Sequence, residues 1–210
     1  MNDAIGFVRD IVINLMHEVA AALNKVSRGR ISPDAVTIFG VLMHVPIAFL
    51  IGSGHFLWAA LLLVVFGLFD KLDGELARLQ KRASVRGMLL DASTDRMKEV
   101  MLYSGAAYVL AGGTHPRVAA WAVAACGASL CVSYVKAKGE AAIASSKKQI
   151  PHATLNHMFQ DGLLTFELRM AVLVLGLLTG KILLAVGVIA VLSSYTALQR
   201  LVVISRKLEG

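Results

Sequence analysis

Four aspartates gather in one short stretch of the chain, and they fall into two pairs. Asp70 and Asp73 are three residues apart, and Asp91 and Asp95 are four residues apart. Both spacings place the two carboxylates of a pair on one face of a helix. Two helices that carry these pairs and face each other across a short loop would direct four carboxylates at one spot.

Four carboxylates that share a site near a membrane require positive charge between them. An acidic side chain at bilayer depth costs about 2.5–3.5 kcal/mol even on the most lenient insertion scale, and a second like charge adds to that cost. Carboxylate oxygens suit Mg²⁺, Mn²⁺ or Ca²⁺ better than zinc, and pairs of such ions commonly serve phosphoryl transfer. The alternative is a set of solvated salt bridges at helix ends, with the partners Lys71, Arg78, Arg96 and Lys98.

The composition is that of a polytopic membrane protein. Of the 210 residues, 57% are hydrophobic, and the mean hydropathy of +0.68 is too high for a soluble domain. The net charge of +7 then indicates cytoplasmic loops and contacts with anionic membrane lipids, and no nucleic acid is expected as a partner. No secretory signal is expected, because the first strongly apolar stretch follows Arg30.

The apolar runs predict an all-α polytopic membrane protein with six transmembrane helices and an N-terminal amphipathic juxtamembrane helix. The amphipathic helix covers residues 1–30 and is expected to lie along the membrane surface; a helix packed within the bundle is the alternative. Residues 31–210 form the six-helix transmembrane domain. Its spans are expected at about residues 34–51, from 56 on into 70–78, 87–110, 118–135, 166–178 and 182–205, with a polar loop over 141–165.

Basic residues lie mainly in the segments that join the helices on one side of the predicted bundle. The turns on the other side hold only Arg117 and Lys181. Because the side richer in Lys and Arg is cytoplasmic, we expect a multi-pass protein of the cytoplasmic (inner) membrane. Both termini and the four aspartates would then face the cytoplasm.

The aspartates belong to a longer pattern of fixed spacing. It reads Asp70-x-x-Asp73-Gly74-x-x-Ala77-Arg78, then eight residues, then Gly87-x-x-x-Asp91-x-x-x-Asp95. This pattern resembles the signature of the CDP-alcohol phosphotransferases, and every fixed position of that signature is filled. A match of this length is much more specific than a single glycine-rich loop.

The resemblance implies a metal-dependent membrane enzyme. A CDP-activated lipid such as CDP-diacylglycerol would give its phosphatidyl group to the hydroxyl of an alcohol, and CMP would leave. Two Mg²⁺ ions, with Mn²⁺ as a possible substitute, would bind Asp70, Asp73, Asp91 and Asp95, and Asp95 would also be the general base. The implied CDP-lipid site comprises Asp34, Thr37, Asp73, Gly74, Ala77, Arg78, Ser84 and Gly87. Homodimers are common in the family, so a homodimer is expected.

Basic residues in or beside the predicted spans indicate an acceptor that carries a phosphate. Lys136, Arg169 and Arg200 are costly in a membrane, which favours a functional role; snorkelling at a helix end is the alternative. With Ser133 they would bind the acceptor phosphate. The segments 91–96, 133–138, 167–169 and 199–201 resemble those of bacterial phosphatidylinositol-phosphate synthases. Inositol phosphate is therefore the expected acceptor.

Two other functions remain open from the sequence. One is a phosphatidylglycerophosphate synthase that uses glycerol phosphate. The other, of a different class, is an ion-conducting or metal-binding membrane protein whose acidic residues line an ion path. An ion path predicts acidic residues spread through the depth of the bilayer, whereas these four lie near the same ends of two predicted helices.

Overall fold

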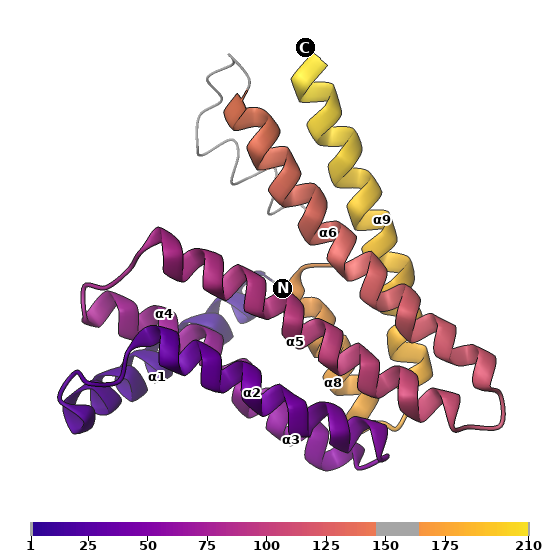
Figure 1. Ribbon diagram of the computed structural model, residues 1–210, viewed down its shortest axis with the longest axis horizontal. Helices are drawn as coiled ribbons and strands as arrows, with labels where there is room; N and C mark the ends of the chain where they lie inside the picture. Colours follow the sequence, from indigo (N-terminus) through magenta and orange to yellow (C-terminus); the bar gives the residue numbers. More distant parts are fainter. Residues whose placement is uncertain (1, 146–163, 210) are drawn as a thin grey trace. The chain divides into compact units, whose positions relative to one another are not determined.

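The computed structural model describes residues 2–145 and 164–209 as helices joined by short turns (Figure 1). No strand occurs in these two ranges, so the prediction of an all-α fold is confirmed. In chain order the helices are α1 (Asn2–Ser27), α2 (Pro33–Gly52), α3 (Phe56–Gly67), α4 (Phe69–Leu79), α5 (Val85–Ala111), the 3₁₀ helix η1 (Pro116–Ala119), α6 (Ala120–Ser145), α8 (Phe166–Leu178) and α9 (Ile182–Glu209).

The chain divides into two compact units. Unit one comprises Met1–Phe49 and Leu61–Met101, and unit two comprises Leu50–Ala60 and Leu102–Gly210. Unit one therefore contains all four aspartates of the motif, whereas unit two contains the basic residues predicted to bind the acceptor phosphate.

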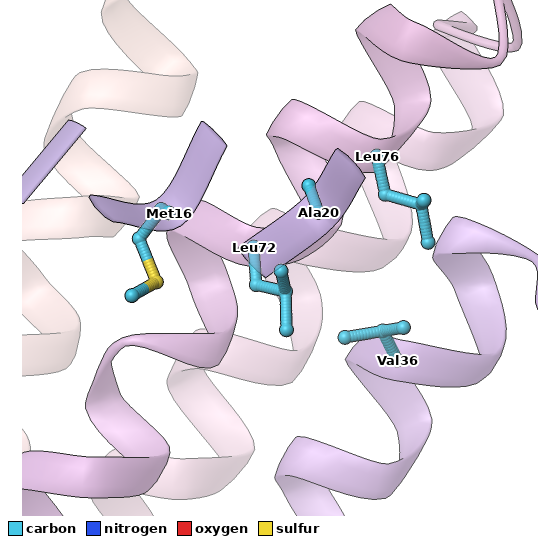
Figure 2. Packing of buried hydrophobic residues seen from close by; sticks show 5 residues of the cluster. All are labelled: Met16, Ala20, Val36, Leu72 and Leu76. Carbon is cyan, nitrogen blue, oxygen red and sulfur yellow. The ribbon is translucent and has the colours of Figure 1, made fainter. Parts of the chain in front are cut away.

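In unit one, α1 packs against α4. Met16 and Ala20 of α1 are buried with Leu72 and Leu76 of α4, and Val36 of α2 completes the cluster (Figure 2). Leu72 and Leu76 are four residues apart and share one face of α4. This apolar contact fixes which side of α4 faces α1 and α2.

The second predicted span is interrupted where one continuous helix was expected. α3 ends at Gly67 and α4 begins at Phe69, so the prediction of an uninterrupted helix into residues 70–78 was wrong. The backbone at Leu68 remains in the right-handed helical region, with φ −78° and ψ −16°. Gly67 lacks a Cβ, so its backbone has more conformational freedom than that of other residues, and glycine is frequent where helices break or kink.

Three helical segments of the described residues are long and apolar enough to cross a membrane. They are Pro33–Gly52, Pro116–Ser145 and Ile182–Arg206. α3 has 12 residues and α8 has 13, fewer than the roughly 20 that a helical span needs. The protein is thus an all-α membrane protein, and the six-span topology stays a prediction.

In unit two, α6 and α9 run side by side (Figure 1). Ile143 of α6 and Ile204 of α9 are buried together, which explains why α6 continues to Ser145. The prediction that a polar loop begins at residue 141 was therefore wrong for residues 141–145. Residues 146–163 of that predicted loop lie outside the described residues.

α8 and α9 form a close helical hairpin. A Cβ added at Gly176 of α8 would lie 2.3 Å from the Cβ of Ala185 of α9, a separation that real Cβ atoms do not adopt. The absence of a side chain at Gly176 thus permits this approach of the two helices.

We predict that Gly176→Ala lowers the free energy of unfolding by about 1–3 kcal/mol, because overpacking forces the two helices apart. Thermal unfolding in detergent would measure the change. Gly187→Ala on α9 is the matched control, since in the described part of the chain no atom outside the local helix backbone lies within 4 Å of its added Cβ. The control should be neutral or stabilising, and equal losses in both variants would contradict the prediction.

Candidate active site

Three of the four predicted aspartates come together in unit one. Asp70, Asp91 and Asp95 each contribute a carboxylate oxygen that lies within 4.8 Å of the other two. Asp70 belongs to α4, and the other two lie one turn apart on α5. All three residues are partly buried. The structure therefore joins the two halves of the motif through these residues, here called the three-carboxylate group.

Asp73 lies outside this group and is bound to α2. Thr37 Oγ1 donates a hydrogen bond to Asp73 Oδ2 over 2.5 Å, and both residues are only 5% exposed. Burial raises the pKa of Asp73 to about 6, while the hydrogen bond from Thr37 opposes that rise. The sequence predicts both residues as contacts to the CDP-lipid, and the structure pairs them with each other.

A buried lysine contacts two members of the three-carboxylate group. Lys98 on α5 forms an ion pair with Asp70, and its Nζ lies 3.2 Å from Asp95 Oδ1. Burial raises the pKa of Asp70, and the charge of Lys98 opposes that rise. The Lys98 side chain is 2% exposed, so the alternative of a solvated salt bridge is wrong for this residue. Its spacing of three residues from Asp95 was the sequence signal for a shared helix face.

Arg78 on α4 is accessible to a ligand. Its side chain is 67% exposed, and its Nη2 donates to Glu75 Oε1 over 2.7 Å. A Cβ added at Gly74 would lie 3.7 Å from that Nη2. The absence of a side chain at Gly74 therefore leaves space beside the guanidinium. Ala77, also predicted to contact the CDP-lipid, is partly buried. An exposed guanidinium in this setting suits a phosphate.

One ion pair links the beginnings of α2 and α5. Ser84 caps α5, because its Oγ accepts a hydrogen bond of 3.1 Å from the Gly87 amide. Arg86 Nη2 lies 3.8 Å from Asp34 Oδ2 in the first turn of α2. Three residues predicted to contact the CDP-lipid, Asp34, Ser84 and Gly87, therefore occupy one region of unit one.

Unit two contains two buried arginines whose charges repel each other. Arg169 is 1% exposed and Arg200 is 7% exposed, and the two guanidinium groups interact electrostatically. Arg169 Nη1 donates to the carbonyl of Leu164 over 3.1 Å, and Arg200 Nη1 lies 3.5 Å from the carbonyl of Val132. Like charges that are buried close together favour the binding of an ion of opposite sign.

The other two predicted phosphate ligands lie on α6. Ser133 follows Val132 and donates a hydrogen bond of 3.4 Å to the carbonyl of Ser129, so it lies beside the α6 carbonyl that Arg200 contacts. Lys136 is exposed, and its Nζ lies 3.9 Å from Glu140 Oε1. The structure thus brings the two arginines together and leaves Lys136 at an exposed carboxylate.

Comparison with known proteins identifies the family. Residues 30–197 match the CDP-alcohol phosphatidyltransferase family. The phosphatidylinositol phosphate synthase of Corynebacterium glutamicum is 32% identical over 182 residues, which cover 82% of this chain and 77% of that protein. A bifunctional IPC transferase and DIPP synthase of Rubrobacter xylanophilus is 33% identical over 177 residues, which cover 84% of this chain and 38% of that protein.

Solved structures share the fold of this chain. The Mycobacterium tuberculosis phosphatidylinositol phosphate synthase with CDP-DAG bound has a TM-score of 0.74 at 24% identity, covering 91% of this chain and 94% of that one. The same enzyme in complex with manganese and citrate has a TM-score of 0.76 at 24% identity, covering 90% and 88%. The resemblance that the aspartate motif predicts is confirmed by the family match over most of the sequence, and the chain belongs to the CDP-alcohol phosphatidyltransferase family.

Proposed function

We propose that this protein transfers the phosphatidyl group of CDP-diacylglycerol to a hydroxyl of an inositol phosphate and releases CMP. The family supplies the reaction type. The acceptor is supported by the name of the Corynebacterium glutamicum relative, and the donor by the Mycobacterium tuberculosis structure with CDP-DAG bound. The observation that carries the proposal in this chain is the three-carboxylate group on α4 and α5.

The three-carboxylate group fits a divalent metal. Asp91 Oδ1 is buried and has no hydrogen-bond partner among the described residues. This is energetically costly for a carboxylate oxygen, and coordination to a metal ion would remove the cost. Oxygen donors suit Mg²⁺ and Mn²⁺, and the Mycobacterium tuberculosis enzyme has been solved with manganese. We propose two Mg²⁺ ions per site, replaceable by Mn²⁺, with Asp73 as the fourth carboxylate ligand.

The chemistry follows from the residues around this group. Asp70, Asp91 and Asp95 would hold the metal, which would supply positive charge for the pyrophosphate of the donor and for the departing CMP. Asp95 accepts the proton of the attacking hydroxyl as general base. Arg78 binds a phosphate of the donor, and Gly74 and Ala77 give the nucleotide room beside α4. The other proposed contacts to the CDP-lipid are Asp34, Thr37, Ser84 and Gly87.

The acceptor phosphate is proposed to bind in unit two. Arg169 and Arg200 supply two buried guanidinium groups whose mutual repulsion an anion would relieve. Guanidinium groups bind phosphate in a planar, two-point geometry that lysine does not provide. Ser133 and Lys136 are the further proposed ligands.

The proposed setting is the cytoplasmic (inner) membrane, with six spans and the catalytic residues facing the cytoplasm. Three segments already have the length and hydropathy of spans, and the distribution of Lys and Arg supports the orientation. On α1, Leu15 is 52% exposed and Val19 is 39% exposed, which supports a position along the membrane surface. A homodimer stays a prediction.

The proposed function is tested by the choice of acceptor. We expect purified protein with CDP-diacylglycerol and Mg²⁺ to release CMP with inositol phosphate, and not with glycerol phosphate or free inositol. Phosphate-binding arginines require the acceptor phosphate, which excludes free inositol. CMP release with glycerol phosphate alone would support the proposed type of reaction but would show that inositol phosphate is not the acceptor. No CMP release with any of the three would contradict the proposed function.

We expect Asp95→Asn to abolish CMP release while Mn²⁺ and CDP-lipid binding persist, because an amide is not a general base and Asp70 and Asp91 remain as ligands. Activity and direct binding should be measured on the same preparation. Glu18→Gln is the control, since it makes the same chemical change at an exposed position of α1. Turnover at the wild-type rate would exclude Asp95 as the base.

Arg200→Ala should raise the KM for inositol phosphate roughly 10- to 100-fold, the usual effect of losing a hydrogen bond to a charged group. The KM for the CDP-lipid should change little. Arg206→Ala, at an exposed position of the same helix, should change neither constant. A selective rise in the KM for the CDP-lipid would show that Arg200 serves the donor instead.

A further inference from the structure

Lys98 is an unusual residue for the interior of unit one. It is 1% exposed, and lysine is almost never fully buried unless it is paired. Its partners are Asp70 and Asp95, which are two of the four carboxylates proposed to hold the metal. A fixed positive charge of the chain therefore occupies part of the site where a divalent cation is expected.

The contacts of Lys98 connect two helices. Asp95 lies three residues before Lys98 on α5, whereas Asp70 lies on α4, 28 residues away in sequence. An ion pair between neighbouring residues of one helix needs no tertiary structure, but the pair with Asp70 forms only when α4 and α5 are correctly placed. Lys98 thus holds the two halves of the aspartate motif together.

Charge balance gives this contact its importance. Three carboxylates within 4.8 Å of one another repel strongly when they are partly buried. Removing one partner of a buried ion pair is strongly destabilising, because the other charge stays buried without compensation. Arg96 Nη2 lies 3.7 Å from Asp95 Oδ2, but for Asp70 the ion pair in the described residues is the one with Lys98.

We propose that Lys98 is a built-in counter-cation, which holds Asp70 and Asp95 together before the metal binds and yields these carboxylates to the metal. The inference rests on the proposed metal-binding role of the three-carboxylate group. Lys98 is in this sense a positioning residue for the site. Two consequences follow, a loss of metal-free stability without Lys98 and a competition between Lys98 and the metal.

The test compares Lys98→Met with Lys71→Met in the full-length protein in detergent. Lys71 is exposed and directly follows Asp70 in sequence, so it controls for the loss of one lysine nearby.

In EDTA, the thermal midpoint of Lys98→Met should fall by roughly 5–10 °C, and Mn²⁺ should restore most of the loss. The Kd of Lys98→Met for Mn²⁺, measured by electron paramagnetic resonance, should be about tenfold lower than that of the wild type. The reason is that the Lys98 ammonium group no longer competes with the metal for the carboxylates. Lys71→Met should match the wild type in both measurements.

A double variant separates charge balance from a general packing defect. Asp70→Asn with Lys98→Met removes both partners, so its metal-free midpoint should lie above that of Lys98→Met alone. This comparison also applies where Lys98→Met folds poorly. A double variant no more stable than Lys98→Met would overturn the inference.

The outcomes distinguish this inference from the proposed function. If the wild-type protein binds no Mn²⁺, the proposed metal site is wrong, and the competition between Lys98 and the metal is overturned with it. If the wild type binds Mn²⁺ but Lys98→Met has an unchanged or weaker affinity, the metal site stands and only the inference about Lys98 is overturned.

Discussion

Repulsion between partly buried carboxylates is the constraint on which unit one depends. Asp70, Asp91 and Asp95 approach within 4.8 Å, and a folded protein tolerates this only where positive charge compensates them. Lys98 provides such charge within the chain, and under the proposed function a divalent cation would provide more. The proposed metal would in turn bind a pyrophosphate that is itself negative, which requires several carboxylates around it.

The apolar packing around the site meets a different demand, which is orientation. Met16 and Ala20 of α1 bury Leu72 and Leu76 of α4 (Figure 2), and this contact keeps one side of α4 turned inward. Asp70 is then available to α5. The helix that the sequence predicts at a membrane surface therefore also supports the helix that carries half of the aspartate motif.

Unit two also holds like charges in a buried region, but there the charges are positive. Arg169 and Arg200 are buried with charges that repel, and each guanidinium contacts a backbone carbonyl. Two buried guanidinium groups favour an anion over a neutral molecule, so the proposed phosphorylated acceptor suits these residues better than an uncharged alcohol would.

The sequence by itself determined the all-α class, the membrane character and the family, because these depend on composition and on spacings within single helices. It could not show that Thr37 binds Asp73 across 36 residues, or that Lys98 is buried against Asp70 across 28. Helical periodicity places a side chain on a face of its own helix but does not specify which distant helix packs there. The tertiary structure alone decided that Asp70, Asp91 and Asp95 form one group while Asp73 pairs with Thr37 of α2. It also decided that α6 continues to Ser145. The physical reason is that apolar contacts between helices distant in sequence determine how each helix is placed.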